Sequence, residues 1–584
     1  MSPYAAPLAE IRFALRHLGG LGDHGDAAAP ELVDAVLDEA ARLAGEVIAP
    51  TNRAGDREGA RLVGGVVTTP TGFKDAYAAL VQGGWNGLAF PVEHGGQGLP
   101  ALLAIAVQEM WHSANMALAL CPLLTQAAVH LLLHHGSPAQ KRLYLPKLVT
   151  GEWTGTMNLT EPQAGSDLGA LRMRAVRDGE RYLLTGQKIF ITYGDHDLAE
   201  NIVHMVLARI QGAPPGPKGI SLFLAPKIMV DDAGKLLAAN DVRVVSLEHK
   251  LGIHGSPTAV MAYGDGGGAT GFLVGEENRG LEAMFVMMNN ARLAIGVQGL
   301  AVAERAYQQA RAYAATRLQG RAPDGAGPAA ILKHPDIRRM LVTMTARIEA
   351  ARGLTYIAAD ALDSGRHRNQ PDRLRLGELL TPVVKAWCTD MGVEVASAAL
   401  QVQGGMGYIE ETGAAQHYRD ARIAPIYEGT NGIQANDLVL RKLGRDGGEA
   451  ARRFIGAVAL IDAELAARDG PDFAAIRAGL SAARADLAAA TEWMVAALRG
   501  DAASALAGAV PYLKLFGTVG GGFAMARSAL AAERLRRDGA DRFLDAKIGT
   551  ARFYAEHILP LSAALRPAIV SGAASALAFP EEIF

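Results

Sequence analysis

The stretch "PIYEGTNGIQ" (residues 425–434) places one carboxylate, Glu428, between an aromatic residue and Gly429. Asp437 is the only other acid in the ten residues that follow Glu428. A carboxylate in such a place is usually a solvated loop residue, yet a general base that acts alone looks the same in a sequence. The other motifs of the chain must decide between these two interpretations.

A second stretch, "MNLTEPQAGSDLGA" (residues 157–170), begins as a strand and ends in a loop of small and hydroxyl residues. Thr160 and Ser166 offer hydrogen-bonding groups, and Gly165 allows a ligand to approach the backbone. By itself this stretch is equally typical of a polar turn. It contains no GxGxxG or Walker motif, so it does not predict a nucleotide-binding βαβ unit.

A third stretch, "QKIFITYG" (residues 187–194), reads as a strand. Side chains two residues apart share a face of a strand, so Phe190 and Thr192 are expected on the same face. An aromatic ring beside a hydroxyl suits a planar cofactor that forms hydrogen bonds, although an ordinary strand has the same pattern.

A fourth stretch, "QVQGGMGY" (residues 401–408), follows a long predicted helix. Its glycine pair, Gly404 and Gly405, suits the approach of a phosphate to the backbone. Glycine is also the commonest residue at the end of a helix, so this pattern alone does not choose between the two roles.

The elements that must position these residues follow a clear order. Apolar residues at helical spacing predict helices throughout residues 1–150, and β-prone runs separated by glycine and proline fill residues 151–278. Residues 279–445 return to long helices, and residues 446–584 are alanine-rich and helical. The predicted fold is therefore mainly α with a central β domain, an α+β chain. Its four domains are an N-terminal helical domain, a β domain, a helical bundle with Glu428 and an additional C-terminal helical domain.

Several local expectations can be checked. A helix in residues 31–50 is expected to stop at Pro50, and residues 114–136 are expected to form a buried helix rather than a membrane span. The Asp178–Gly179 pair predicts a hairpin. Strands are expected at residues 201–210 and 220–226. One stripe of a later helix is expected in the core: Val384, Trp387, Cys388, Met391 and Val395.

Composition excludes several classes of protein. Half of the residues are hydrophobic and 20% are charged, as in ordinary globular proteins. The net charge of −3 gives no general attraction to nucleic acid or anionic lipid. The two cysteines, Cys121 and Cys388, form no CxxC pair, which argues against a thiolate metal site or a disulfide framework. With no signal-peptide pattern at the N-terminus, a cytoplasmic location without integral membrane association is expected.

Taken together, the motifs resemble those of the acyl-CoA dehydrogenase family. "LTEPQAGSDLGA" resembles the first signature of that family, with Asn158 before it in place of the small residue or cysteine most often found there. "QVQGGMGY" through "IYEGTN" resembles the second signature. Order, spacing and the helix–β–helix pattern agree over about residues 30–445. The N-terminal "YAAPLAEIRFAL" and the block after about residue 446 resemble the larger bacterial branch, which includes 3-methylthiopropanoyl-CoA and medium- to long-chain acyl-CoA dehydrogenases.

The resemblance implies an FAD enzyme that oxidises an acyl-CoA thioester to the trans-2-enoyl-CoA. Glu428 matches the base that removes the α-proton while hydride passes to flavin N5, and Gly429 matches a residue that lies against the thioester. Some family members carry the base at the position of Ala291, which cannot act as one. Arg292 matches a residue that lines the substrate entrance.

The resemblance also implies the residues that contact FAD. Thr160 and Thr192 match residues that hydrogen-bond the flavin ring, and Ser166 matches the place where flavin and pantetheine meet. Arg317 matches a residue that reaches FAD across a subunit interface, although "RLQGR" replaces the common R-x-x-F-G pattern there. The complete expected set is Met157, Leu159, Thr160, Gly165, Ser166, Phe190, Thr192, Arg317, Gln401, Gly404, Gly405, Thr430 and Asn431.

The expected partners are an acyl-CoA substrate, an electron-transfer flavoprotein and a second copy of the chain. A homodimer is expected because the helices after residue 446 would cover the face that smaller relatives use to form tetramers. Three alternatives remain: an acyl-CoA oxidase that uses oxygen, a DNA-binding relative of the alkylation response, and a nitroalkane oxidase. The mixed charges of the C-terminal block argue against DNA binding, and Glu428 argues against the nitroalkane oxidases, which usually carry Asp there. No metal is expected.

Overall fold

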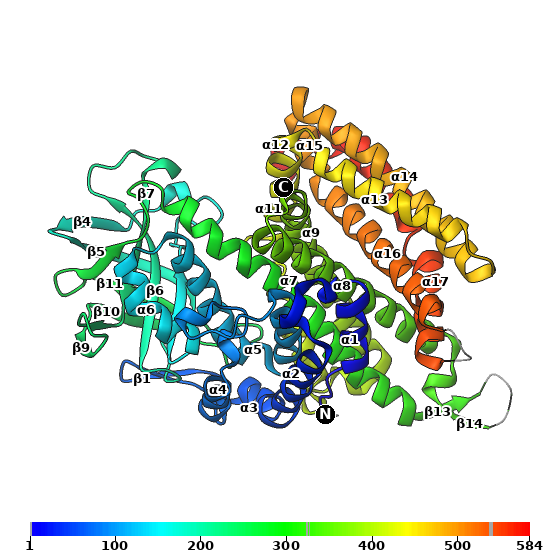
Figure 1. Cartoon of the computed structure of the whole chain (residues 1–584), viewed down its shortest axis with the longest axis horizontal. Helices are drawn as coiled ribbons and strands as arrows, with labels where there is room; N and C mark the ends of the chain where they lie inside the picture. The colour runs from blue at the N-terminus through cyan, green and yellow to red at the C-terminus, as the bar shows by residue number, and fades with distance from the viewer. Residues whose placement is uncertain (1–2, 323–324, 326, 537–540) are drawn as a thin grey trace. The chain divides into compact units, whose positions relative to one another are not determined.

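The computed structural model describes residues 3–322, 325, 327–536 and 541–584. The chain falls into two compact units. Unit 1 comprises Met1–Asp38, Pro100–Glu109 and Ile295–Phe584, and unit 2 comprises Glu39–Leu99 and Met110–Ala294. Two long helices, α5 (Ala101–His135) and α7 (Gly280–Thr316), contribute residues to both units. The helical chain with one central sheet confirms the predicted α+β fold class (Figure 1).

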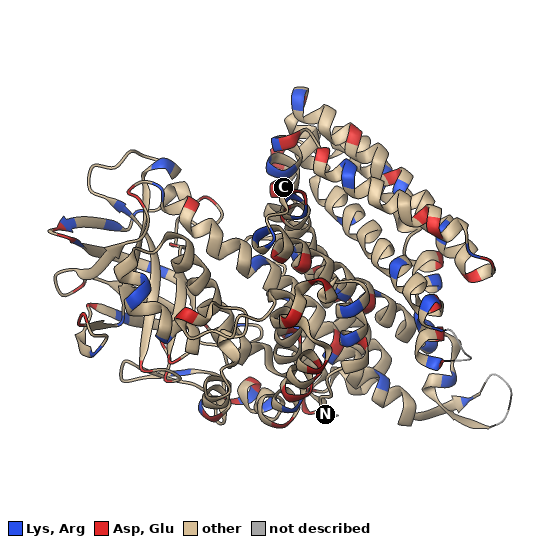
Figure 2. Ribbon diagram, in the orientation of Figure 1, with Lys and Arg blue, Asp and Glu red and all other residues tan. Residues whose placement is uncertain are grey.

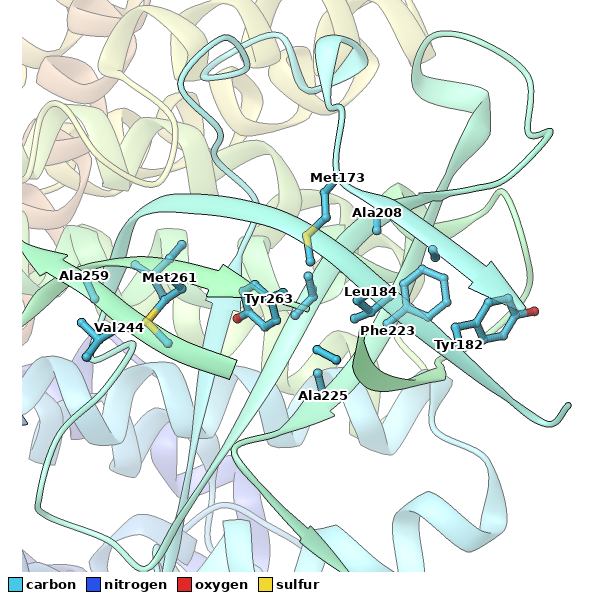
Figure 3. Close-up of a cluster of buried hydrophobic side chains, with 14 of the residues drawn as sticks. Met173, Tyr182, Leu184, Ala208, Phe223, Ala225, Val244, Ala259, Met261 and Tyr263 are labelled. Carbon is cyan, nitrogen blue, oxygen red and sulfur yellow. The ribbon is translucent and has the colours of Figure 1, made fainter. Parts of the chain in front are cut away.

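The framework of unit 2 is a sheet that holds eight strands within the described part of the chain, in the order β10-β11-β5-β12-β7-β6-β3, with β4 paired to β5 and β6. β3 and β4 run parallel to β6, and the remaining pairs of this sheet are antiparallel. The strands are β3 (Trp153–Asn158), β4 (Arg174–Asp178), β5 (Arg181–Thr192), β6 (Asn201–Ile210), β7 (Ile220–Pro226), β10 (Val242–Leu247), β11 (Thr258–Tyr263) and β12 (Ala269–Leu273). Figure 3 shows the apolar core of this sheet, in which Tyr182, Leu184 and Phe223 pack on one another.

The predicted strands and hairpin of this region are confirmed. β6 and β7 occupy the predicted residues, and β4 turns into β5 through Gly179 and Glu180. Short pairs outside the main sheet are β1 (Arg61–Val63) with β2 (Val66–Thr68), β8 (Ile228–Val230) with β9 (Leu236–Ala239), and β13 (Leu318–Arg321) with β14 (Pro328–Ala330). The β1–β2 hairpin corrects the expectation of helices throughout residues 1–150. Its turn is Gly64-Gly65, both with positive φ, a glycine pair typical of a tight hairpin.

The helix expected to stop at Pro50 continues beyond it. α2 (Pro30–Arg42) leads through a π-helical segment (Leu43–Ile48) into α3 (Ala49–Glu58). Pro50 lies in the first turn of α3, where its missing N–H and fixed φ are tolerated. The wider π turn before it provides the change of hydrogen-bond register that separates the two helices. Unit 2 also contains α4 (Phe73–Gln82) and α6 (Pro138–Thr150), of which α6 packs on β3.

The buried helix expected at residues 114–136 is confirmed as the second half of α5. This is the one helix among the described residues that is long and apolar enough to cross a membrane, and 89% of its most apolar window is buried inside the protein. The helix breaks at Asn115, whose φ of −157° is not helical. The Asn115 amide compensates by donating a 2.8 Å hydrogen bond to Thr51.

Unit 1 is helical. Its first part contains α1 (Leu8–His17), α8 (Pro335–His367), α9 (Pro371–Gln403), α10 (Ala414–Ala421) and α11 (Asn431–Asn436). Its last part contains α12 (Gly444–Asp446), α13 (Glu449–Ala466), α14 (Pro471–Gly500), α15 (Ala502–Ala507), α16 (Ala509–Leu535), α17 (Arg542–His557), α18 (Leu561–Val570) and α19 (Ala573–Leu577). Figure 1 shows α13, α14, α16 and α17 as neighbouring helices, yellow to red. The stripe predicted on α9 is buried as expected.

Two glycines let α7 and α9 cross closely in unit 1. A Cβ on Gly299 would lie 2.3 Å from the carbonyl oxygen of Cys388 and 2.7 Å from Cα of Thr389. A Cβ on Gly392 would lie 2.7 Å from the carbonyl oxygen of Gly299. Such distances leave no room for any side chain, so at these two positions the helices meet backbone to backbone.

Candidate active site

Glu428 lies on the turn between α10 and α11, in a conformation that side chains rarely adopt. Its φ is 55° and that of Gly429 is 83°, so two successive residues are left-handed. Glycine takes this conformation freely, whereas for a residue with a Cβ it costs about 1–2 kcal/mol. Strain of this kind persists only where the surroundings fix the backbone, and it is concentrated at functional sites.

Hydrogen bonds on both sides fix this turn. Before Glu428, the hydroxyl of Tyr427 donates to the side-chain oxygen of Gln298. After it, the amide N–H of Asn431 donates to the Pro425 carbonyl at 2.9 Å, and the side chain of Gln434 donates to the Gly429 carbonyl at 3.1 Å. The partly buried Glu428 carboxylate is thus presented on a closed, braced turn.

The side chain of Asn431 anchors the turn to α9. Its oxygen accepts a 2.9 Å hydrogen bond from the Lys385 ammonium. Its amide donates to Thr389 Oγ1 at 3.0 Å, to Asp390 Oδ1 at 2.7 Å and to the Ala386 carbonyl at 3.2 Å. Asn431 is therefore a positioning residue for Glu428 in this structure, and its expected FAD contact stays a prediction. Its neighbour on the turn, Thr430, caps α11 by accepting from the Ile433 N–H at 3.2 Å.

The electrostatics of the turn keep the neighbouring phenol neutral. Burial raises the pKa of Tyr427 well above its ordinary value, and the negative charge of Glu428 raises it further. Asp437, the other acid of this stretch, is buried in the π-helical segment after α11 and pairs with Arg441 at 3.4 Å. The alternative base position carries Ala291, which is buried in α7.

In unit 2, several of the predicted FAD residues gather where β3 meets β5. Met157, the last residue but one of β3, is buried, and Leu159 and Thr160, just after the strand, are partly exposed. The carbonyl of Thr160 accepts a 2.9 Å hydrogen bond from the Ile189 N–H, which ties this loop to β5. Further along the loop, Gly165 and Ser166 are both exposed.

Phe190 is the feature of this region that best fits a planar ligand. Its ring is 59% exposed and its φ is 60°. The register of β5 shifts here, because Ile191 pairs with Ala259 while Lys188 pairs with Met261, so an extra residue bulges out of the ladder. An exposed aromatic ring held in a strained bulge, with Thr192 partly exposed two residues on, fits the flat ring of a flavin.

A buried ion pair that the sequence analysis missed supports this surface. The Lys188 side chain is fully buried, and its ammonium donates to Glu161 Oε1 at 2.8 Å and to the Leu159 carbonyl at 2.9 Å. Glu161 also accepts from the N–H groups of Arg172 at 2.7 Å and Met173 at 3.1 Å. The pair therefore joins the loop after β3 to the bulged strand β5.

The pKa values of the pair reflect its burial. Burial lowers the pKa of Lys188 to about 8 despite the nearby Glu161. Burial alone would raise the pKa of Glu161, but the charge of Lys188 and the hydrogen bonds to Glu161 outweigh it and lower that pKa. The sequence did contain a signal for this pair. Lys188 lies an even number of residues from Tyr182 and Leu184 along β5, so it is expected on the same buried face of the strand.

The unusual Asn158 also finds partners in the fold. Its amide donates to Thr156 Oγ1 at 2.8 Å, and its oxygen accepts from the Tyr263 hydroxyl at 2.8 Å. Thr156 in turn contacts His204 Nδ1 at 2.7 Å. These side chains form a polar chain inside the sheet, so the amide of Asn158 is satisfied where the family usually has a small residue or cysteine.

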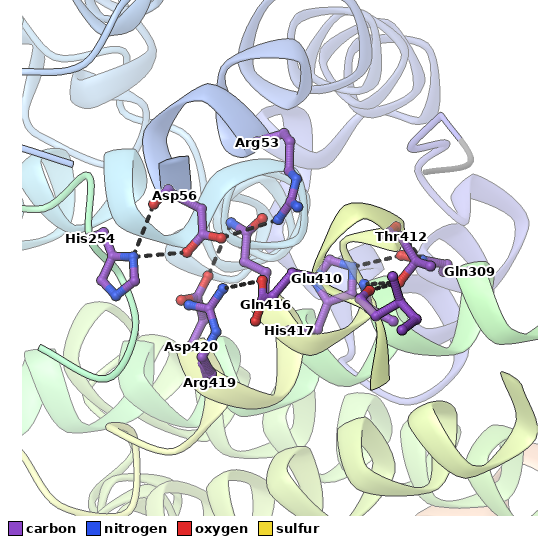
Figure 4. Close-up of polar contacts among 12 residues, drawn as sticks. Arg53, Asp56, His254, Gln309, Glu410, Thr412, Gln416, His417, Arg419 and Asp420 are labelled. Carbon is purple, nitrogen blue, oxygen red and sulfur yellow. Dashed lines mark hydrogen bonds and ion pairs between the residues drawn. The ribbon is translucent and has the colours of Figure 1, made fainter. Parts of the chain in front are cut away.

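The residues expected to reach a partner subunit are exposed in unit 1. Gln401 lies in the last turn of α9, Gly404 and Gly405 follow in a 3-10 turn (Gly404–Tyr408), and Arg317 lies just after α7. A side chain of α7, Gln309, braces the segment after the glycine pair (Figure 4). It donates to the Thr412 carbonyl at 3.0 Å and contacts His417 Nε2 at 3.1 Å.

The structure thus places the predicted residues in separate groups. Unit 2 holds the residues of β3, its following loop and β5, together with Arg292, which is 3% exposed and donates to Asn289 at 3.2 Å. Unit 1 holds the Glu428 turn, the end of α9 and Arg317. Their roles toward FAD and substrate stay predictions.

Family models match almost the whole chain. They are the acyl-CoA dehydrogenase N-terminal domain (residues 31–152), middle domain (156–265) and C-terminal domain (278–443), and an acetyl-CoA dehydrogenase C-terminal-like domain (457–580). The chain is 49% identical over 571 residues to 3-methylmercaptopropionyl-CoA dehydrogenase of Ruegeria pomeroyi, covering 95% of this chain and 96% of that protein. This agrees with the expected large bacterial branch.

Two solved structures share the fold over most of the chain. ACDH-11 of Caenorhabditis elegans in complex with C11-CoA has a TM-score of 0.74 at 22% identity, covering 96% of this chain and 93% of that one. An acyl-CoA dehydrogenase of Bacillus anthracis complexed with FAD has a TM-score of 0.72 at 20% identity, covering 95% of this chain and 90% of that one. The models, the relative and the shared fold together show that this chain belongs to the acyl-CoA dehydrogenase family, whose cofactor is FAD.

Proposed function

We propose that the chain catalyses the α,β-dehydrogenation of an acyl-CoA thioester to the trans-2-enoyl-CoA, with Glu428 as the base. The observation that carries this proposal is the left-handed Glu428 on its braced turn, followed by Gly429. A positioned base must hold its carboxylate within hydrogen-bond reach of the proton that it removes. The strain and the Asn431 anchor supply such positioning.

FAD would be held by the residues already named in unit 2 around Phe190 and Thr160, with Gln401, Gly404, Gly405 and Arg317 contributed by a second subunit. When bound, it supplies the acceptor for the hydride that leaves the β-carbon. The exposed ring of Phe190 supports this assignment, because a planar cofactor would cover it.

Glu428 would take the α-proton onto a carboxylate oxygen. The neutral Tyr427 does not compete as a base, since its pKa is raised. The N–H of Glu428 would donate to the thioester oxygen, and the absence of a side chain on Gly429 leaves room for this approach. In other enzymes, one such donor contributes about 3–4 kcal/mol to transition-state stabilisation.

For the substrate we propose a short acyl-CoA, with 3-methylmercaptopropionyl-CoA as the first compound to test. The identity of 49% over nearly the full length of the Ruegeria enzyme supports this choice. An electron-transfer flavoprotein would accept the electrons, and a homodimer would complete the FAD site. The buried, free thiols of Cys121 and Cys388 fit the reducing cytoplasm.

The decisive experiment is rapid mixing of the anaerobic flavoprotein with acyl-CoA. Glu428→Gln should keep its FAD and bind substrate, while flavin bleaching slows by at least about 10²–10⁴-fold. Glu411→Gln, an exposed acid on the connection between α9 and α10, is the matched control and should bleach at the wild-type rate. Bleaching of Glu428→Gln at the wild-type rate would show that the base lies elsewhere.

Two further assays of the purified protein distinguish the alternative functions. Peroxide release at a rate matching substrate oxidation would identify an oxidase. DNA binding that disappears with added salt would support the alkylation-response alternative. Figure 2 argues against the latter, because Lys and Arg are interspersed with Asp and Glu along the C-terminal helices.

A further inference from the structure

A polar cavity in unit 1 is lined by none of the residues assigned to the reaction. Its volume is about 290 Å³. The connection after α1, the end of α8, the start of α9 and the middle of α16 form its walls. The charged residues that line it are Asp23, Asp360, Arg368, Arg373 and Arg527.

The more buried of the two acids that line this cavity already has several partners. Asp360 is 4% exposed and pairs with Arg373. It also accepts from Ser364 Oγ at 3.0 Å and contacts His24 Nε2 at 3.2 Å. Asp360 therefore orients Arg373 but has little capacity left for another cation.

Two guanidinium groups of the cavity are left without a carboxylate. Within the described chain, neither Arg368 nor Arg527 has an ion pair, and Nη2 of Arg368 is buried with no hydrogen-bond partner. Arg527 contacts the ring of Phe523, 5.6 Å from its centre. A buried donor of a charged group is costly to leave unsatisfied, so a ligand that accepts hydrogen bonds would be stabilising here.

The charged groups that line the cavity also favour an anionic ligand. Burial and then the positive charge of Arg373 lower the pKa of Arg527, so these two cations repel one another. Asp23, an exposed acid on the wall, offsets part of this charge by raising the pKa of Arg373 against the effect of burial. The cavity nevertheless holds one more guanidinium than carboxylate.

We propose that this cavity binds a phosphate-bearing anion. Guanidinium groups form paired, charge-assisted hydrogen bonds with phosphate oxygens. Three guanidinium groups suit a phosphate, which presents three or four oxygens, better than a carboxylate, which presents two. A water occupies about 30 Å³ in the liquid, so the cavity has room for a phosphate together with a small ester substituent.

The test is isothermal titration calorimetry of the FAD-loaded protein with sodium phosphate at constant ionic strength. Wild type should show saturable binding, and Arg368→Gln and Arg527→Gln should each weaken it at least tenfold. Arg375→Gln is the matched control: Arg375 is exposed on α9, pairs with Asp372 and does not line the cavity. This control should bind phosphate as wild type does.

Glycerol 3-phosphate and succinate complete the design. Tighter binding of the ester than of phosphate would identify a phosphorylated metabolite as the ligand, and equal binding would identify the free ion. The proposal is overturned if no saturable binding occurs, if both Arg variants bind like wild type, or if succinate binds and phosphate does not. Thermal unfolding checks that each variant is folded, and Arg368→Gln alone decides if Arg527→Gln is not.

Discussion

Replacing Lys188 by methionine would remove the ammonium at the centre of the buried pair while keeping a side chain of similar length. Glu161 would lose its 2.8 Å partner, and the Leu159 carbonyl would lose its donor at 2.9 Å. The carboxylate would remain buried, with the N–H groups of Arg172 and Met173 and the side chain of Gln163 as its remaining donors. We expect the loop after β3 to detach more readily from β5.

The free-energy cost of Lys188→Met depends on the Glu161 carboxylate, which stays charged and buried. Removing one partner of a buried ion pair costs about 3–5 kcal/mol, because the other charge is left uncompensated. Each 1.4 kcal/mol is a factor of ten, so local opening should increase by roughly 10²-fold to several thousandfold. Adding Glu161→Gln removes the charge while keeping an acceptor for the backbone N–H groups. The double variant should then cost only about 1–2 kcal/mol, close to the loss of ordinary hydrogen bonds.

Hydrogen–deuterium exchange measures this opening directly. Peptides covering residues 159–173 should exchange much faster in Lys188→Met, and peptides from β6 and β7 serve as the internal control. The double variant should return toward the wild-type rate. Unchanged exchange in Lys188→Met, or faster exchange in the double variant than in the single one, would refute the role assigned to the pair.

Three further outcomes are expected. Phe190→Ala should weaken FAD binding by about tenfold with folding intact, as measured by equilibrium dialysis, because an aromatic stack contributes about 0.5–1.5 kcal/mol beyond the burial of its area. Asn431→Ala should slow flavin reduction by about 10²-fold at unchanged FAD content, since it releases the Glu428 turn from α9; an equal loss of FAD would contradict this role. Because the folded pKa of Glu161 is lowered, its stabilising contribution is complete above its ordinary pKa of 4.5 and is lost as the pH falls through the lowered value. Lys188→Met should move acid-induced flavin release, followed by fluorescence, to higher pH.

Local patterns in the sequence predicted much of the fold. The β-prone runs between glycine and proline placed β6 and β7 at their observed residues, and the glycine of the Asp178–Gly179 pair turns the β4–β5 hairpin. The prediction at Pro50 was wrong because proline is common both in the first turn of a helix and just after the end of one. The residue alone does not distinguish these two places. The difference lies in the π-helical register before it, which depends on the packing of the surrounding chain.

The candidate site, too, could be predicted only in part from local patterns in the sequence. Its motifs pointed to Glu428, but no local pattern indicates that this residue is left-handed or that four groups of α9 hold Asn431. Those contacts join residues more than 40 positions apart. Lys188 and Glu161 were missed for a similar reason, because a buried charge is stable only with a partner that the fold brings to it.

The close backbone contact between α7 and α9 at Gly299 and Gly392 limits which substitutions this enzyme can accept there. Gly299 touches the backbone at Thr389, and Thr389 holds the side chain of Asn431, which braces the turn of Glu428. A close backbone contact at Gly299 thus helps to set the position of the Glu428 carboxylate. A single added methyl group at Gly299 would force α7 and α9 apart and so shift the turn that carries Glu428. Any residue other than glycine at this position would first have to separate the two helices, because no side chain fits between their backbones.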